Sequence, residues 1–369
     1  MKLDNNIQAF FELVQAGLWG KGDPDIRIDG TPDWNNIYRL AHEQSVLGLV
    51  LAGLELSKVK PPKEVLLQWI GDVQVIEQRN KAMNKFVAEL IERLRKADIY
   101  AILVKGQGIA QCYEKPLWRS SGDVDLLLSE DNYEKAKNYL LPLASSVEQE
   151  FVFLKHLGMQ ISGWEVELHG SQRPRLTKKI DHVVDEVQQD VFYGGHVRSW
   201  MNGLTQVFLP GPDIDVIFVF THILHHFYQE GVGLRQICDW CRLLYTYKNT
   251  LNVPLLESRL RKAGLMREWK AFAAFAVSYL GMPIEAMPLY SADRKWSRTA
   301  NQINDFVMEV GNFGHSRNPK RGSSFFGCKL SSLWRRTVDS ARHSLVFPKN
   351  FIKIWWHMVR TGLKVVSGE

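Results

Sequence analysis

The acidic residues Asp123 and Asp125 lie one residue apart at the start of an aliphatic run that ends at Leu128. In a β-strand, side chains two residues apart point to the same face, so the two carboxylates would project together. Val124, Leu126 and Leu128 would face the opposite way, into a core. Adjacent carboxylates repel each other, and a divalent cation such as Mg²⁺, which prefers oxygen ligands, removes that conflict. The spacing therefore favours a metal site that handles phosphate.

A third carboxylate is expected from a neighbouring strand, because metal-assisted phosphoryl transfer commonly uses paired ions held by several carboxylates. Residues 164–169 alternate between apolar and polar side chains. In a strand, this alternation puts Glu165, Glu167 and His169 on one face. From the residues alone, either glutamate could be the third ligand.

The elements that would position these acids follow from changes in periodicity. Apolar residues recur at helical spacing through residues 1–95. Short apolar runs predict strands at 100–104, 124–128, 151–161 and 164–169, the last two joined by a turn at Ser162-Gly163. Further helices are expected at 108–113, 131–141, 178–190, 212–227, 234–248 and 255–280, with short strands within 197–209. A Gly-rich and basic loop is expected at 311–326.

This order predicts an α+β protein in which a small mixed β-sheet is flanked by N-terminal and C-terminal helical regions. The length of 369 residues suits two or three domains. We expect an N-terminal helical region, a core that holds the sheet, a helical region that covers the cleft, and a basic C-terminal region. Their expected bounds are 1–95, 96–210, 211–290 and 291–369.

The composition is that of a globular protein, with 45% hydrophobic and 23% charged residues, and it argues against wholesale disorder. No apolar run reaches the roughly 18 to 20 residues of a membrane-spanning helix. The first residues lack the pattern of a secretory signal. Four scattered cysteines do not form a disulfide framework, and the Cys238-x-x-Cys241 pair, which has no second pair, favours a structural role. We expect a cytoplasmic protein.

The net charge of +6 is unevenly placed, because residues 291–369 contain 14 Lys and Arg but only 5 Asp and Glu. Such a basic region favours contact with a polyanion, such as nucleic acid, or with an anionic membrane surface. Residues 347–363 have the pattern of a basic amphipathic helix, which could lie peripherally on a membrane. The alternatives are a solvated basic surface and a helix docked on the protein body.

Taken in order, the motifs resemble the nucleotidyltransferase superfamily, which includes the catalytic domain of DNA polymerase beta. Within it, the chain is most similar to a group of uncharacterised bacterial nucleotidyltransferases. The resemblance covers about residues 35–245 and continues weakly through 222–226 and 234–239. It rests on Leu103-Val104-Lys105-Gly106, Arg119, Gly122-Asp123-Val124-Asp125-Leu126-Leu127, His156 and Val166-Glu167-Leu168-His169.

The resemblance implies a Mg²⁺-dependent enzyme, with Mn²⁺ as an alternative ion. Such an enzyme moves a nucleoside monophosphate from a nucleoside triphosphate to an acceptor and releases pyrophosphate. Asp123, Asp125 and Glu167 take the places of the metal-binding and catalytic carboxylates. Glu167 could also orient or deprotonate an acceptor hydroxyl. The acceptor could be a small molecule, a protein or an RNA.

One departure from the superfamily concerns nucleotide binding. Lys105-Gly106 occupies the place where most members have Gly-Ser or Gly-Gly, and the serine there grips the nucleotide phosphates. The following Gln107 supplies no hydroxyl. The groups that could bind phosphate instead are backbone N–H groups of the next helix, Lys105, Gly106, Arg119, Ser120 and Ser121. The departure supports a second hypothesis, a catalytically inactive nucleotide- or nucleic-acid-binding module on the same fold.

Further residues are expected to line the cleft. His222 and His226 lie four residues apart on a predicted helix and could share a face with each other. That spacing also occurs in zinc sites, but no glutamate lies between them as in zinc proteases. His169 is the last residue of the predicted strand that carries the two glutamates. Arg235 could reach a phosphate or the acceptor, or it could pair with Asp239 on a helix surface.

Overall fold

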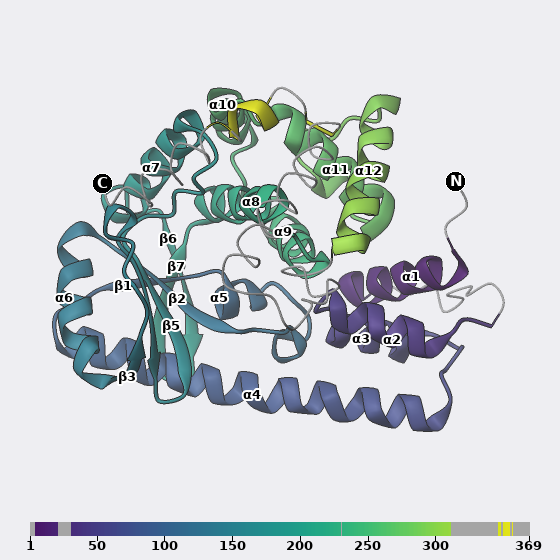
Figure 1. The fold of residues 1–369 in the computed structure, drawn as a ribbon, viewed down its shortest axis with the longest axis horizontal. Helices are drawn as coiled ribbons and strands as arrows, with labels where there is room; N and C mark the ends of the chain where they lie inside the picture. Colours follow the sequence, from purple (N-terminus) through teal and green to yellow (C-terminus); the bar gives the residue numbers. More distant parts are fainter. Residues whose placement is uncertain are drawn as a thin grey trace, which may run out of the picture.

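The computed structural model describes residues 4–20, 31–229, 231–310, 346–347, 350–354 and 356. These residues form a five-stranded mixed sheet and a separate two-stranded hairpin, surrounded by helices (Figure 1). This arrangement confirms the predicted α+β class. Among the described residues, no helix is both long enough and apolar enough to cross a membrane.

A single long helix underlies much of the molecule. The N-terminal helices are α1 (Asn5–Trp19), α2 (Trp34–Glu43), α3 (Leu47–Leu56) and α4 (Lys63–Lys96). With 34 residues, α4 is about 50 Å long and runs beneath both the sheet and α1 to α3 (Figure 1). Trp69 and Val73, near its start, pack into the core of the helical part of the molecule. Met83 and Val87, farther along, pack under the sheet.

The main sheet has the order β1-β2-β5-β4-β3. Its strands are β1 (Ala101–Val104), β2 (Asp123–Leu128), β3 (Ala144–Val147), β4 (His156–Ile161) and β5 (Trp164–His169). β2 and β5 are parallel, and the other neighbouring pairs are antiparallel. Ser162 and Gly163 both have positive φ angles, as a two-residue type I′ hairpin turn requires. The predicted turn between these strands is confirmed.

The sheet differs from the prediction at one edge. β3 was not expected, because its half-buried or exposed residues carry no apolar alternation. β4 begins at His156 rather than at residue 151. Phe151 and His156 form an isolated bridge around the 3₁₀ helix η3 (Val152–Leu154), and Lys155 closes this turn in the left-handed region at a φ of 48°.

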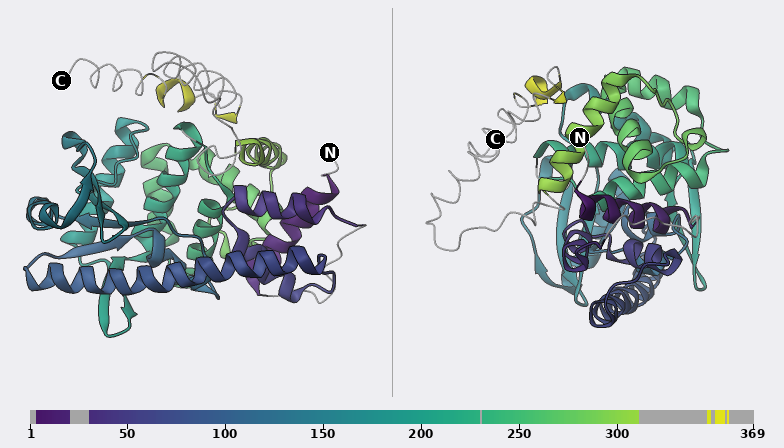
Figure 2. Two further views of the ribbon diagram at one scale, coloured as in Figure 1. Left: turned by 60° about the horizontal axis from the view of Figure 1, so that its bottom comes forward. Right: turned by 90° about the vertical axis from the view of Figure 1, so that its right-hand side faces the viewer.

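The remaining elements surround the sheet and its neighbouring helices. Between β1 and α8, the chain also forms the helices α5 (Gly106–Ala110), α6 (Glu130–Leu140) and α7 (Lys178–Phe192), the short 3₁₀ helices η1 (Pro116–Trp118) and η2 (Leu141–Leu143), and the hairpin β6 (Val197–Asn202) with β7 (Thr205–Pro210). The left view of Figure 2 shows this hairpin extending past α4. The later elements are α8 (Pro212–Gln229), α9 (Leu234–Tyr247), α10 (Val253–Ala263), α11 (Met266–Leu280), η4 (Ile284–Ala286) and α12 (Arg294–Val310).

The helix predicted at 255–280 is two helices. Gly264 ends α10 in the left-handed conformation that favours glycine. Cys238 and Cys241 are free, fully buried thiols on α9, which agrees with a structural role. The expected loop at 311–326 lies outside the described residues, and so does most of the expected helix at 347–363. The proposed contact of this basic region with a polyanion or membrane stays a prediction.

β2 separates two hydrophobic cores. Val124, Leu126 and Leu128 are buried in the core between the sheet, α4 and α6, as their alternation predicted. Leu127 is buried on the other face, in the core that includes α8 and α9. Because side chains alternate along a strand, Asp125 shares the face of Leu127. The acidic residues therefore lie on the side of the sheet that faces α8 and α9.

Candidate active site

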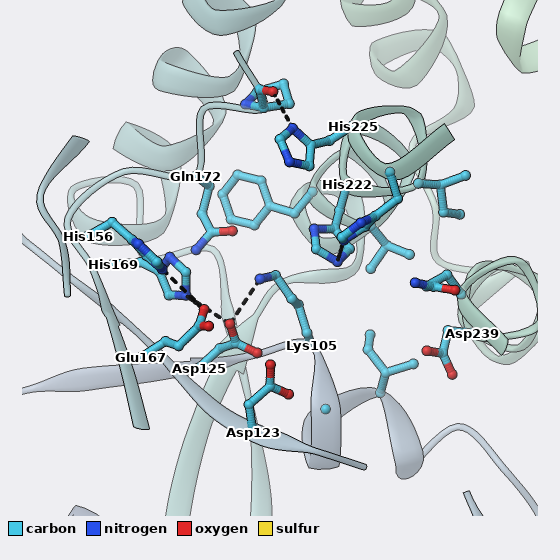
Figure 3. Close-up of a pocket in the computed structure, with 18 of the residues that line it drawn as sticks. Lys105, Asp123, Asp125, His156, Glu167, His169, Gln172, His222, His225 and Asp239 are labelled. Carbon is cyan, nitrogen blue, oxygen red and sulfur yellow. Dashed lines mark hydrogen bonds and ion pairs between the residues drawn. The ribbon is translucent and has the colours of Figure 1, made fainter. Parts of the chain in front are cut away.

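Three carboxylates converge at the neighbouring strands β2 and β5. Their parallel register places Asp123 opposite Glu165 and Asp125 opposite Glu167. One oxygen each of Asp123, Asp125 and Glu167 lie within 4.8 Å of one another, and Figure 3 shows these side chains grouped at the base of a cavity. Glu165 is outside this cluster. Of the two glutamates that the alternation allowed, Glu167 is therefore the one that meets the aspartates.

Two nitrogen groups of the chain already contact the most buried carboxylate. Nζ of Lys105 lies 2.9 Å from Oδ1 of Asp125, and Nε2 of His169 lies 2.8 Å from the same oxygen. Burial disfavours the charge of Asp125, but Lys105 and the hydrogen bond from His169 hold its pKa below the usual value. Burial also opposes the charge of Lys105, yet Asp125 and the other carboxylates raise its pKa. Both groups therefore stay charged.

Glu167 is held by two imidazoles. Nε2 of His156 and Nε2 of His169 each lie 3.2 Å from its Oε2. Burial disfavours the charged form, but these hydrogen bonds hold the pKa of Glu167 below its usual value. Burial and Lys105 act to lower the pKa of His169, whereas its bonds to the two carboxylates raise it overall.

Of the three carboxylates, Asp123 has the fewest contacts that balance its negative charge. No described side chain makes a hydrogen bond or ion pair with it within the usual contact distances. The neighbouring Asp125 charge, together with burial, raises the pKa of Asp123 to about 6. Three converging carboxylates, one of them destabilised by its neighbour, form an oxygen-rich set that fits a hard divalent cation such as Mg²⁺.

A cavity of about 360 Å³ opens above the carboxylates. This volume falls within the range of about 300 to 1,000 Å³ that is usual for small-molecule sites. Its opposite wall comes from α8, α9 and the segment after β5 (Figure 3). The lining includes the sequence-predicted residues Lys105, Gly106, Arg119, Asp123, Asp125, Glu167, His169, His222, His226 and Arg235.

Arg119 and Ser121, both predicted to bind phosphate, are engaged with the protein itself. Nε and Nη2 of Arg119 each donate to one carboxylate oxygen of Asp239, both at 2.7 Å. Nη1 donates to Oγ of Ser121 at 2.8 Å. Ser121 is not among the described residues that line the cavity. Arg119 therefore lies in the cavity wall with its guanidinium hydrogen-bonded to Asp239 and Ser121, and Ser121 does not line the cavity.

The alternative surface pair between Arg235 and Asp239 is not formed. Asp239 is only 5% exposed, and its carboxylate accepts from Arg119 and from the hydroxyl of Tyr113. Nη1 of Arg235 donates to the carbonyl of Ser120 at 2.8 Å. Nε of Arg235 is buried and has no partner among the described residues. Arg235 thus contributes a buried donor to the cavity wall rather than a surface ion pair.

The three histidines of α8, His222, His225 and His226, line the cavity. Nε2 of His222 and Nε2 of His226 are 3.1 Å apart, and Nδ1 of His225 donates to the carbonyl of Pro174. Burial holds the pKa of His222 well below its usual value, so this imidazole is neutral near pH 7. Within the described ranges, no Cys, Asp, Glu or further His completes a metal-binding cluster around this pair.

Two glutamines that were not predicted as site residues also line the cavity. The amide nitrogens of Gln172 and Gln236 are buried without a hydrogen-bond partner among the described residues, and both residues line the cavity. Oε1 of Gln236 accepts from the backbone N–H of Gly233 at the start of α9. An unpaired buried donor is costly, so these amides favour a ligand that carries acceptor oxygens. Gln236 lies within the weakly matching stretch 234–239, but nothing in the sequence assigned a role to it, and Gln172 lies in no motif.

Comparison with protein-family models places the chain in one family. Residues 30–281 match the model of the family described as Uncharacterised nucleotidyltransferase, and the chain belongs to that family. A search of solved structures found similarity to an antigenic nucleotidyltransferase-like protein from Paracoccidioides brasiliensis. The two are 15% identical, with a TM-score of 0.33, over 55% of this chain and 93% of the fungal one. No curated protein matches the chain.

Proposed function

We propose that this protein is a Mg²⁺-dependent nucleotidyltransferase. It moves a nucleoside monophosphate from a nucleoside triphosphate to an acceptor hydroxyl, phosphate or amine and releases pyrophosphate. The observation that carries the proposal is the convergence of Asp123, Asp125 and Glu167 beneath a cavity. Membership of the nucleotidyltransferase family supports it.

Asp123, Asp125 and Glu167 would hold the metal. When bound, Mg²⁺ supplies charge stabilisation to the transferring phosphoryl group and to the leaving pyrophosphate. Binding requires that Asp123 lose its proton, because a protonated carboxyl is a poor ligand. The ammonium of Lys105 places a positive charge beside Asp125. Lys105 would contact the phosphates in place of the serine hydroxyl of other superfamily members.

The triphosphate would be positioned by donors that lack partners in the described part of the chain. These are Nε of Arg235 and the amide nitrogens of Gln172 and Gln236. Phosphate oxygens accept hydrogen bonds strongly and would satisfy all three. We assign the wall formed by His222 and His226 to the acceptor. The neutral imidazole of His222 can donate a hydrogen bond to an acceptor group or receive one from it.

A second candidate is an inactive nucleotide-binding module, and one observation favours it. The side chain of Gln107 cannot replace the serine that other members use, because it is 2% exposed and donates to Oδ1 of Asn80. If the phosphates are held too weakly for reaction, the protein would bind nucleotide without turnover. Calorimetry with Mg²⁺ and nucleotides, run beside the transfer assay, separates these two functions.

The direct test uses two samples of each nucleoside triphosphate, one labelled at the α-phosphate and one at the γ-phosphate, with Mg²⁺ and cell extract. We expect the purified chain to transfer the α label and not the γ label. Asp125→Asn should abolish transfer, whereas Asp131→Asn, an exposed residue in the first turn of α6, should not affect it. Transfer of the γ label, or equal labelling by Asp125→Asn, would contradict the proposal.

A further inference from the structure

A second cluster of ligand atoms lies beside the three carboxylates. β4 and β5 are antiparallel, and their register places His156 directly opposite His169. Glu167 lies two residues before His169 and therefore shares its face. One ligand atom from each of these three residues lies within 4.8 Å of the others. The cluster combines two imidazoles with one carboxylate, so it differs from the oxygen-only set beside it.

The separations within this cluster suit an ion. Both imidazole Nε2 atoms face the same oxygen, Oε2 of Glu167, at 3.2 Å. Ligands about 2.1 Å from a tetrahedral ion are about 3.4 Å apart, so a small movement would admit one. The rings lie 4.7 Å apart between centroids, and Phe151 stacks on His156. Because adjacent strands carry the ligands, the sheet holds them in place.

We propose that His156, Glu167 and His169 form a site for a divalent cation of the zinc class, such as Zn²⁺ or Co²⁺. Neutral imidazole is a preferred ligand of these ions, whereas Mg²⁺ prefers carboxylates and water. An ion here would take the place of the protons that the two imidazoles share with Glu167. Binding of the ion would also break the hydrogen bond from His169 to Asp125. Asp125 would keep its contact with Lys105.

Glu167 belongs to this site and to the acidic cluster. A carboxylate has two oxygens and can ligate two ions, so the two sites can be occupied together. In that arrangement the zinc-class ion lies beside the cation held by Asp123 and Asp125. The proposal concerns binding alone, and it stands whether or not the protein transfers nucleotides.

Absorption spectroscopy with Co²⁺ tests the site, because four-coordinate Co²⁺ with imidazole ligands absorbs visible light far more strongly than octahedral Co²⁺ held by carboxylates and water. We expect the metal-free full-length chain to bind Co²⁺ with such a band, and Zn²⁺ to displace it. Excess Mg²⁺ should leave the band in place. His156→Gln should weaken Co²⁺ binding more than tenfold. The matched control is His182→Gln on α7, because the side chain of His182 is 66% exposed and also lies next to a glutamate.

Three further experiments keep the test decisive. Circular dichroism of His156→Gln shows whether the variant is folded. The Zn²⁺-dependent rise in melting temperature of the unaltered chain then reports binding without any variant. Asp123→Asn should lose the oxygen-only site and keep the Co²⁺ band, which separates this site from the proposed enzymatic function. The proposal is overturned if the band is absent, is removed by Mg²⁺, or is equal in His156→Gln; any of these would mean that the imidazoles only donate hydrogen bonds to Glu167.

Discussion

The ammonium of Lys105 lies 2.9 Å from Oδ1 of Asp125, so a cation of the chain stands beside a carboxylate that is only 2% exposed. Lys105 adopts a positive φ of 56°, which is unusual for a residue with a side chain. The turn after β1 therefore holds a strained residue whose charge compensates the acidic cluster. The positive charge of Lys105 reduces the repulsion among the carboxylates, so they can lie close together in the metal-free protein.

Replacement of Lys105 should make the fold depend on metal. Lys105→Met leaves the Asp125 charge partly uncompensated, and we expect it to lower the free energy of unfolding by about 3 kcal/mol in EDTA. Because Mg²⁺ can supply the missing charge, it should stabilise this variant more than the unaltered chain. Urea unfolding with and without Mg²⁺ measures both effects. Lys81→Met, which removes an exposed pair on α4, should cost no more than about 0.5 kcal/mol. Equal stabilisation by Mg²⁺ in both Lys105→Met and the unaltered chain would rule out this role.

Asp123→Asn should stabilise the metal-free protein in a pH-dependent way. Its folded-state pKa of about 6 is above the usual 3.8, so the fold retains a proton that the unfolded chain releases. The protonated form of Asp123 is the one that the fold favours, so the stability of the fold falls as the pH rises from about 4 to 6 and this carboxyl loses its proton. Asparagine removes the penalty, which amounts to at most about 3 kcal/mol at pH 7.5.

Melting in EDTA at pH 4 and pH 7.5 checks this prediction. The gain from Asp123→Asn should appear at pH 7.5 and be absent at pH 4, while calorimetry shows weaker Mg²⁺ binding. A variant that melts below the unaltered chain at pH 7.5 would show that Asp123 stabilises the empty site.

The pair between Arg119 and Asp239 should be a main determinant of stability. Arg119 is 7% exposed and donates two parallel hydrogen bonds across the wall of the cavity. Arg119→Met would leave the carboxylate of Asp239 buried without its cation, at a cost of about 3 to 5 kcal/mol. Arg119→Lys should restore only part of this, because an ammonium cannot make the forked contact. Urea unfolding measures both, with Arg261→Met on α10 as the exposed control. A loss below about 1 kcal/mol in Arg119→Met would contradict the assignment.

Arg235→Met should separate nucleotide binding from metal binding. If phosphate oxygens accept from Nε of Arg235, the Kd for a nonhydrolysable nucleoside triphosphate should rise tenfold or more. Mg²⁺ binding without nucleotide should not weaken, because a positive charge near Asp123 is removed. Calorimetry gives both constants, and Arg261→Met again serves as control. Parallel losses of nucleotide and Mg²⁺ affinity would indicate a damaged fold instead.

Local periodicity was sufficient to predict the acidic pair. Asp123 and Asp125 share a face because strand side chains alternate, and that depends on nearest neighbours alone. The contribution of Glu167 rather than Glu165 required the family resemblance, since both point the same way. The partner of Asp239 could not be predicted, because Arg119 lies 120 residues away and only the tertiary fold joins them. The same holds for Gln172, whose unpaired amide results from the packing around it.

The side-chain amide of Asn80, on α4, contacts two segments that precede β2: the helix α5 and the residues around η1. Its nitrogen donates to the carbonyls of Leu117 and Arg119, and its oxygen accepts from Gln107. Both segments are thus hydrogen-bonded to the same residue of the long helix α4. We therefore expect the floor of the cleft to move together with α4, so that any opening that admits a substrate comes from the opposite wall.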